Sequence, residues 1–231
     1  WNVTARFNHP FIKVFEEERE LTVMLVIDVS GSRNFGTAMR TKRELITEIA
    51  AVLSFSAIQN NDKIGAILFS NKVEKFIPPK KGRSHILRII RELLDFEPQE
   101  QTTNISEALR YLTNAIKKKS ISFLISDFIA PDFEDAIRIA NQKHDLIALQ
   151  IYDPRETEMP PVGLMKLQDA ETGSWKWVDT FDTQTRNAYR NWWITRQQKL
   201  VQLFRKSGVD NASIRTNEDY IKPLINIFKN R

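Results

Sequence analysis

Four short apolar runs, rich in Val, Ile and Leu, recur along the chain and are separated by longer segments with a different spacing. Short runs without alternating polar positions are typical of strands buried on both faces, as in a parallel sheet. The intervening segments carry apolar residues three and four positions apart, which predicts helices. The predicted buried strands are 23–27, 63–70, 121–127 and 145–151.

The alternation of strands and helices predicts the fold class. We expect an α/β fold, doubly wound, with a mostly parallel central sheet flanked by helices. The segment 41–58 is apolar almost all round, so we expect that helix to be well buried. Ser84 and Asn217 are expected to cap the helices that follow them. The predicted helices are 41–58, 84–94, 104–116, 131–142, 183–206 and a last one from Asn217 to the terminus.

In the long helix 183–206, Trp192 and Trp193 fall on an apolar stripe that predicts core packing.

Smaller elements are expected outside this alternation of strands and helices. They are a strand over 10–15, a strand over 73–77 that follows a turn at Asn71-Lys72 and stops at Pro78-Pro79, a small hairpin of 163–167 and 175–178 turning at 169–173, and a strand over 213–215.

A polar cluster directly follows the first buried strand. Asp28, Ser30 and Ser32 alternate in the sequence DVSGS, and Gly31 lets the backbone turn tightly enough for both hydroxyls to face one point. Ligands of open α/β sheets bind outside the carboxyl ends of the strands. Three hard oxygen donors suit a hard cation such as Mg²⁺. For this stretch alone, an ordinary strand-end turn is the alternative.

Two more polar positions fall at the same end of the predicted sheet. Asp127 ends the third buried strand, and Thr103 lies in a polar loop before a helix. Alone, Asp127 would be a strand-end turn, and either Thr103 or Asn104 would cap the helix. Thr102 is the competing candidate for the threonine. Together the three clusters predict one metal site at this edge of the sheet.

The order Asp28-x-Ser30-x-Ser32, then Thr103, then Asp127 resembles the metal-ion-dependent adhesion site of von Willebrand factor A-type (VWA) domains. The resemblance implies that the three hydroxyls bind a divalent cation, and that the two carboxylates bind it directly or through water. Mg²⁺ is the expected cation, with Mn²⁺ or Ca²⁺ as alternatives. A partner's Glu or Asp would complete the shell. The family usually has Gly before this Thr and often Asp after it, where this chain has Thr102 and Asn104.

Longer blocks resemble the bacterial family labelled domain of unknown function fifty-eight. They are 7–20, 28–36, 62–93, 123–128, 143–156 and 167–173. The resemblance implies one VWA-like domain over 1–231, with an α/β core and hairpin in 1–180 and a C-terminal helical segment, 181–231, packed on it. The blocks at 153–156 and 169–173 are expected to be turn-formers that hold the hairpin on the domain.

Members of that family are commonly encoded beside MoxR-type AAA ATPases and resemble the Bat proteins, often with membrane helices of their own. The resemblance therefore implies an interaction domain that serves such an ATPase in a chaperone, assembly or stress system. We expect a cytoplasmic location, as the cytoplasmic part of a membrane-anchored protein. Because the chain begins at Trp1, we expect a fragment whose membrane contact lies in absent segments.

Composition narrows the function classes. The chain has no Cys, which excludes disulfides, thiolate metal sites and a cysteine nucleophile and fits a reducing compartment. Its three His residues are too scattered for a zinc site. A haloacid dehalogenase-type phosphatase needs a second Asp where Ser30 stands. There is no GxSxG elbow and no phosphate-binding Gly loop. We therefore expect no enzymatic activity.

The basic charge is concentrated at the end of the chain. Residues 181–231 hold ten Lys/Arg against four Asp/Glu, although the whole chain carries only +5. A nucleic-acid-binding module built on these helices and on Trp192-Trp193 is therefore the alternative function. We expect a solvated helix surface instead, and no nucleic-acid partner.

Overall fold

The computed structural model describes residues 20–36, 40–168 and 173–229. The strand predicted over 10–15 lies outside these residues, as do residues 169–172 of the hairpin turn. Among the described residues, no helix combines the length and the apolar character needed to cross a bilayer.

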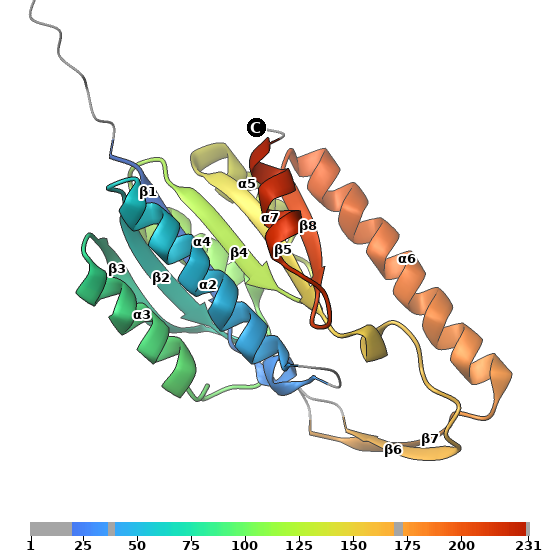
Figure 1. Ribbon diagram of the computed structural model, residues 1–231. Coiled ribbons are helices and arrows are strands. Elements are labelled where there is room, and N and C mark those ends of the chain that lie inside the picture. Colours follow the sequence, from blue (N-terminus) through green and yellow to red (C-terminus); the bar gives the residue numbers. More distant parts are fainter. Residues whose placement is uncertain (1–19, 37–39, 169–172, 230–231) are drawn as a thin grey trace, which may run out of the picture.

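A six-stranded sheet forms the centre of the fold, in the order β3-β2-β1-β4-β5-β8 (Figure 1). All neighbouring pairs are parallel except β2 with β3. This confirms the predicted doubly wound α/β class. The strands are β1 (Thr22–Asp28), β2 (Lys63–Phe69), β3 (Val73–Lys80), β4 (Ile121–Ser126), β5 (Asp145–Tyr152) and β8 (Asp210–Arg215).

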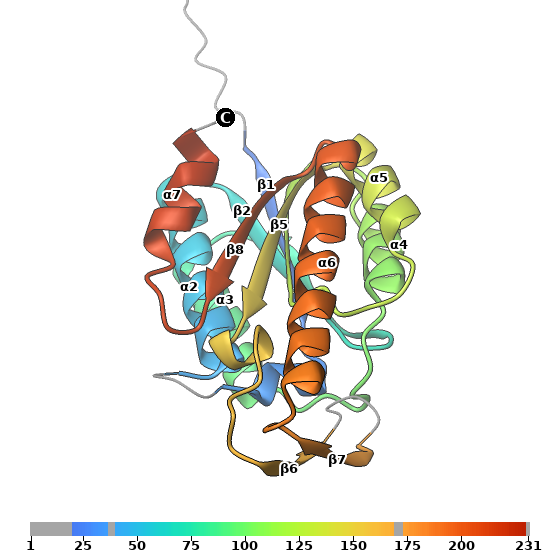
Figure 2. The same cartoon turned by 90° about the vertical axis from the view of Figure 1, so that its right-hand side faces the viewer.

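Helices cover both faces of this sheet, as Figure 2 shows along its edge. On one face lie α2 (Lys42–Gln59), α3 (Arg83–Asp95) and α7 (Ile221–Lys229), and on the other α4 (Ile105–Ala115), α5 (Glu134–Lys143) and α6 (Thr183–Ser207). Within β1, Leu25 and Ile27 pack into the first layer, and Met24 and Val26 into the second. Covering both faces is why β1 reads as an unbroken apolar run.

The chain beyond residue 180 does more than pack on the core, because it supplies β8 to the central sheet. In α6, Trp193, Leu200 and Phe204 are buried, but Trp192 is 48% exposed, so the prediction of core packing for Trp192 is wrong. The prediction for α2 also needs correction. Among the residues that the structure describes, Val52 and Phe55 are each about two-fifths exposed, so the helix is not buried all round.

Several predicted element ends are wrong, three of them for a visible local reason. β3 continues through Pro78-Pro79 to Lys80, since an edge strand tolerates residues that cannot donate a ladder hydrogen bond. There β3 passes so close to Gly65 that a Cβ would lie 2.7 Å from the Ile77 carbonyl oxygen. Helix α3 is capped by Gly82 instead of Ser84. Helix α7 begins only at Ile221, whose N–H is bound by Asp219 rather than Asn217.

A two-stranded hairpin, β6 (Leu164–Gln168) and β7 (Trp175–Asp179), stands apart from the sheet. Both views place it beyond the carboxyl ends of the central strands (Figures 1 and 2). The short helix η2 (Pro154–Glu156) lies between β5 and this hairpin in the chain. The carboxyl edge of the central sheet is therefore the side of the domain that carries the β6–β7 hairpin.

Candidate metal centre

The strand order places a switch point between β1 and β4, the two central neighbours. The helix that follows β1, α2, covers one face, whereas the helix that follows β4, α5, covers the other. In open α/β sheets the crevice at such a point, outside the carboxyl ends of the strands, is the usual ligand site. Asp28 is the last residue of β1 and Asp127 directly follows β4. The structure thus brings both predicted carboxylates to this crevice.

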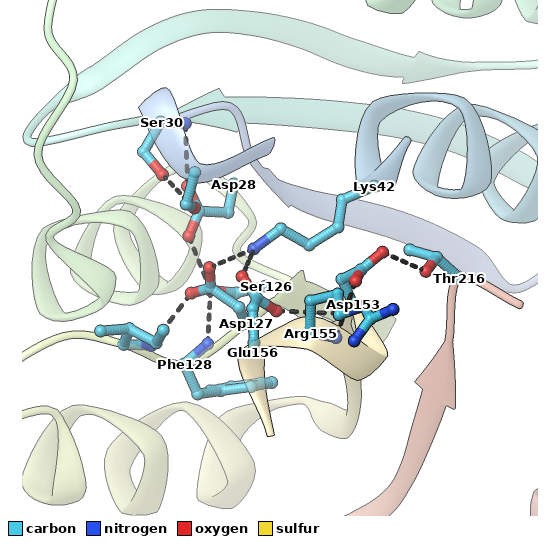
Figure 3. A network of polar contacts seen from close by, with 12 residues as sticks. Asp28, Ser30, Lys42, Ser126, Asp127, Phe128, Asp153, Arg155, Glu156 and Thr216 are labelled. Atoms are coloured by element: carbon cyan, nitrogen blue, oxygen red, sulfur yellow. Dashed lines mark hydrogen bonds and ion pairs between the residues drawn. The ribbon is translucent and has the colours of Figure 1, made fainter. Parts of the chain in front are cut away.

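Asp28 is 4% exposed, and both of its carboxylate oxygens accept hydrogen bonds (Figure 3). The Ser30 backbone N–H donates to Oδ1 at 3.0 Å, and the Ser126 hydroxyl donates to Oδ2 at 2.6 Å. Ser126 Oγ in turn accepts the Phe128 N–H at 3.0 Å. The ends of β1 and β4 are therefore joined through one buried serine.

Ser32 lies in a 3-10 turn, η1 (Gly31–Asn34), and Ser30 directly precedes this turn. Their hydroxyl oxygens are 3.3 Å apart, so they face one point as predicted. Gly31 is the first residue of this turn and has no positive φ. The Gly31 N–H donates to the Gln101 carbonyl at 3.0 Å, which ties η1 to the loop that carries Thr103.

Thr103 is 6% exposed, and its Oγ1 is buried without a hydrogen-bond partner. The next residue, Asn104, caps α4 by accepting the Glu107 N–H at 3.0 Å. Capping by Asn104 removes the alternative role of Thr103. No hydrogen bond joins Thr103 Oγ1 to the other four site residues. A buried unpaired hydroxyl costs free energy unless something binds it, and an oxygen-seeking cation fits that requirement.

Besides Ser126, two charged site residues were not predicted, namely Lys42 and Glu156 (Figure 3). Lys42 Nζ lies 2.9 Å from Asp127 Oδ2 and 2.6 Å from Glu156 Oε1. Asp127 Oδ1 accepts the Ile129 N–H at 3.0 Å. The signal for Lys42 was its place at the start of the helix that follows the Asp28 strand. For Glu156 it was the unexplained block 153–156.

Two residues of the block 153–156, Asp153 and Glu156, have different roles. Asp153 is fully buried, accepts the Arg155 N–H at 2.9 Å as the cap of η2, and accepts the Thr216 hydroxyl at 2.7 Å. This fits the expected turn-former. Glu156 instead belongs to the site through Lys42, and its Oε2 accepts the Asp153 N–H at 2.8 Å.

The electrostatics distinguish the two aspartates. Burial, together with the nearby Asp127 charge, raises the pKa of Asp28 to about 6. Burial also opposes ionisation of Asp127, but the Lys42 ammonium, the Ile129 N–H and Ser32 together outweigh it and keep the pKa of Asp127 below its ordinary value. Burial raises the pKa of Glu156 despite Lys42. Asp28 is thus a buried carboxylate without a cation in contact among the described residues.

The donor set is oxygen-rich and poor in carboxylates. A small cavity of about 10 Å³ is lined by Asp28, Ser32, Lys42 and Asp127, among others. Within the described part of the chain, no group of three or more His, Cys, Asp or Glu residues could hold a metal. A cation here would therefore rely on hydroxyls, a donor type that suits Mg²⁺ better than zinc. The residues present fit such an ion.

A larger cleft of about 660 Å³ opens beside the site. Phe35, one residue past η1, and Glu156 both line it, so it borders the site at two points. Its wall is mostly apolar and comes from the segment after η2, strand β6 and helix α6. The other lining residues are Arg155, Met159, Pro160, Val162, Met165, Leu167, Gln168 and Tyr189.

Two mycobacterial proteins are similar in sequence to this chain over its whole length. The uncharacterized protein Rv1480 of Mycobacterium tuberculosis is 28% identical over 234 residues, which cover the whole of this chain and 74% of that protein. The uncharacterized protein Mb1516 of Mycobacterium bovis matches to the same extent.

Among solved structures, BatB from Bacteroides thetaiotaomicron superposes with a TM-score of 0.61 at 16% identity, over 90% of this chain and 96% of that one. An aerotolerance-related membrane protein from Bacteroides fragilis gives a TM-score of 0.61 at 17% identity, over 90% and 99%. At such identities the likeness concerns the fold alone. The family model described as "Protein of unknown function DUF58" matches residues 1–199. The chain therefore belongs to the DUF58 family, as a VWA-like domain.

Proposed function

We propose that this domain is a metal-ion-dependent protein-interaction module. A divalent cation held by Asp28, Ser30, Ser32, Thr103 and Asp127 would bind a Glu or Asp carboxylate of a protein partner. One observation carries this proposal. The buried, unpartnered Thr103 hydroxyl lies in the loop tied to η1, which follows the buried Asp28 carboxylate at the switch point of the sheet.

Each side chain has a distinct part in this binding. Both oxygens of Asp28 and of Asp127 already accept hydrogen bonds, which fixes their orientation. The carboxylates therefore supply negative charge, whereas Ser30, Ser32 and Thr103 supply neutral oxygens. Bound there, the cation would supply a positive charge that the protein neutralises only in part. A partner carboxylate would complete that neutralisation without any covalent chemistry.

The described residues support binding better than catalysis. A serine hydrolase would need a serine hydroxyl in contact with a histidine. Among the described residues, Ser120 Oγ makes such a contact, with His144 Nδ1 at 2.9 Å. Both residues are buried at the amino end of β4 and β5, opposite the candidate site. Nucleophilic catalysis needs an accessible serine beside its base. We therefore assign the domain no enzymatic role.

The nucleic-acid alternative has less support. Trp193 is buried against Tyr152, with ring centroids 5.6 Å apart. Arg196 of the basic helix α6 donates to the Asp127 carbonyl at 3.1 Å, so this arginine supports the metal centre. Trp192 is exposed, but Arg196 lies over its ring at 5.8 Å. These contacts favour a structural role for the helix.

The partner and the location rest on the family resemblance. We place the domain at the cytoplasmic side of a membrane-anchored protein, with a MoxR-type AAA ATPase as the partner that offers the carboxylate. The structurally similar protein from Bacteroides fragilis is an aerotolerance-related membrane protein, which accords with this placement. The apolar cleft beside Glu156 would add contact area for the same partner.

A pull-down with a purified MoxR-type ATPase tests the proposal. We expect capture by the wild type with Mg²⁺, loss with EDTA, and recovery when excess Mg²⁺ is added. Asp28→Ala should not capture the ATPase under any of these conditions. Glu92→Gln, a change on α3 in a residue that pairs with Lys75 and not with the site residues, is the control that should behave as wild type. Equal capture by Asp28→Ala would refute a role of the cation in this interaction.

A further inference from the structure

Lys42 is a buried lysine whose position is fixed from both ends. Its backbone begins α2 directly after Thr41, which forms a capping box with Glu44. Its ammonium group lies between Asp127 and Glu156, with only 2% of the side chain exposed. A lysine is rarely buried this completely unless it is paired. The pairing therefore determines where this charge sits.

Glu156 is itself held rigidly. Its Oε2 accepts the Asp153 N–H at 2.8 Å, while its Oε1 accepts from Lys42 at 2.6 Å. Asp153 is fully buried and bound to the Thr216 hydroxyl. Glu156 thus draws the ammonium group toward η2, and Asp127 draws it toward the candidate metal centre.

This arrangement puts a fixed positive charge in contact with one of the two carboxylates of the centre. A divalent cation beside Asp127 would share that carboxylate with Lys42 and would be repelled by the ammonium group. Glu156 acts in the opposite sense, because it attracts Lys42 and offsets part of its charge. Neither residue is among those that the adhesion-site pattern specifies.

We propose that Lys42, positioned by Glu156, sets the affinity of the metal centre by acting as a built-in cation that competes with the divalent ion for Asp127. The inference rests on the proposed function, since it presupposes a cation at this site. It assigns Lys42 and Glu156 as positioning and affinity-determining residues. The wild-type protein should therefore bind the metal ion weakly, because Lys42 already neutralises part of the Asp127 charge.

Titration calorimetry with Mn²⁺ as the probe tests this on the full chain. Lys42→Met combined with Glu156→Gln removes the pair without leaving an unpaired Glu156, and should bind Mn²⁺ roughly tenfold more tightly than wild type. Glu156→Gln alone leaves Lys42 to Asp127 only and should bind more weakly. A merely structural pair would lower the affinity in both variants. The matched control, Lys75→Met with Glu92→Gln, removes a 2.5 Å ion pair between β3 and α3 and should leave the affinity unchanged.

Circular dichroism and thermal melting establish that each variant is folded. Should the double variant fail to fold, Lys42→Gln with Glu156→Gln takes its place, because two amides can keep hydrogen bonds where the charges are gone. It should also bind Mn²⁺ more tightly than wild type, whereas a merely structural pair would again lower the affinity. The inference is overturned if the double variant binds no more tightly than wild type, or if Glu156→Gln binds as tightly as wild type. If Mn²⁺ binding in every protein survives Asp28→Asn, or no protein binds Mn²⁺, the proposed function itself fails, and the inference with it.

Discussion

The Ser126 hydroxyl donates to Asp28 Oδ2 at 2.6 Å, and this side-chain bond links the carboxyl ends of the two central strands just beyond their last backbone pair, Ile27 with Ile125. Ser126 is 1% exposed and also accepts the Phe128 N–H. Its deletion would leave a carboxylate oxygen and a backbone N–H without this partner. Buried groups that lose a hydrogen bond carry their full desolvation cost.

Ser126→Ala should therefore lower the free energy of unfolding by about 1–3 kcal/mol, as measured by urea denaturation in EDTA. Ser106→Ala is the matched control, because its hydroxyl donates to the Asp132 carbonyl at the surface. It should cost about 0.5 kcal/mol or less. Equal effects in the two variants would show that the Ser126 bond contributes nothing special.

The raised pKa of Asp28 predicts how stability depends on pH without metal. With a pKa of about 6 in the folded protein against 3.8 ordinarily, the folded state binds more protons between these values. The free energy of unfolding should therefore fall as pH rises from about 4 to 6 and stay lower at pH 7. Asp127, whose pKa is lowered, contributes in the opposite sense, with stability that is lost below about pH 4.

Asp28→Asn isolates the first effect. In EDTA at pH 7 it should be more stable than wild type by up to about 3 kcal/mol, with a flatter pH profile between pH 4 and 6. Denaturant midpoints at several pH values measure this. The wild type should also bind Mg²⁺ more tightly as pH rises through about 6, because ionised Asp28 is the form that attracts the cation. A wild-type profile as flat as that of the variant would contradict the role of Asp28.

Thr103→Val tests the unpaired hydroxyl. The change keeps the shape of the side chain and removes Oγ1, which has no partner. Stability in EDTA should stay the same or rise by about 1 kcal/mol, whereas Mg²⁺ affinity should fall tenfold or more. Thr47→Val on α2, whose hydroxyl donates to the Arg43 carbonyl, should leave the affinity unaltered. Lost stability with unchanged affinity would make Thr103 an ordinary core residue.

Much of the fold could be predicted because both faces of the sheet are covered. Burial on both sides makes β1, β2, β4 and β5 read as continuous apolar runs, and their ends then locate Asp28 and Asp127. Local sequence cannot show which side of a helix the tertiary structure covers. This is why Val52, Phe55 and Trp192 were expected to be buried.

The unpredicted part of the site consists of contacts between distant segments. Lys42 and Glu156 are 114 positions apart, and their sequence signals, the start of a helix and a block expected to form a turn, do not indicate that the two residues pair. Ser126 is hidden within an apolar run, where a serine reads as a small filler. Pairing of this kind depends on the three-dimensional arrangement of strand ends, which spacing in the sequence does not encode.

The packing of α6 gives a test at a distance from the site. Phe204 is 2% exposed and meets the Phe128 ring edge-on, with centroids 5.1 Å apart. Phe204→Ala should cost about 3–5 kcal/mol of unfolding free energy. Trp192→Ala, on the exposed side of the same helix, should cost about 1 kcal/mol or less. Urea denaturation of both variants measures the difference, and equal losses would contradict the packing described for α6.

The proposed function requires that a divalent cation binds at the Asp28 edge of the sheet. An anomalous difference map from crystals grown with Mn²⁺ would locate this cation. We expect one strong peak in contact with the hydroxyls of Ser30, Ser32 and Thr103, beside the Asp28 carboxylate. A map with no peak at these residues, or with its strong peak elsewhere on the protein, would contradict it.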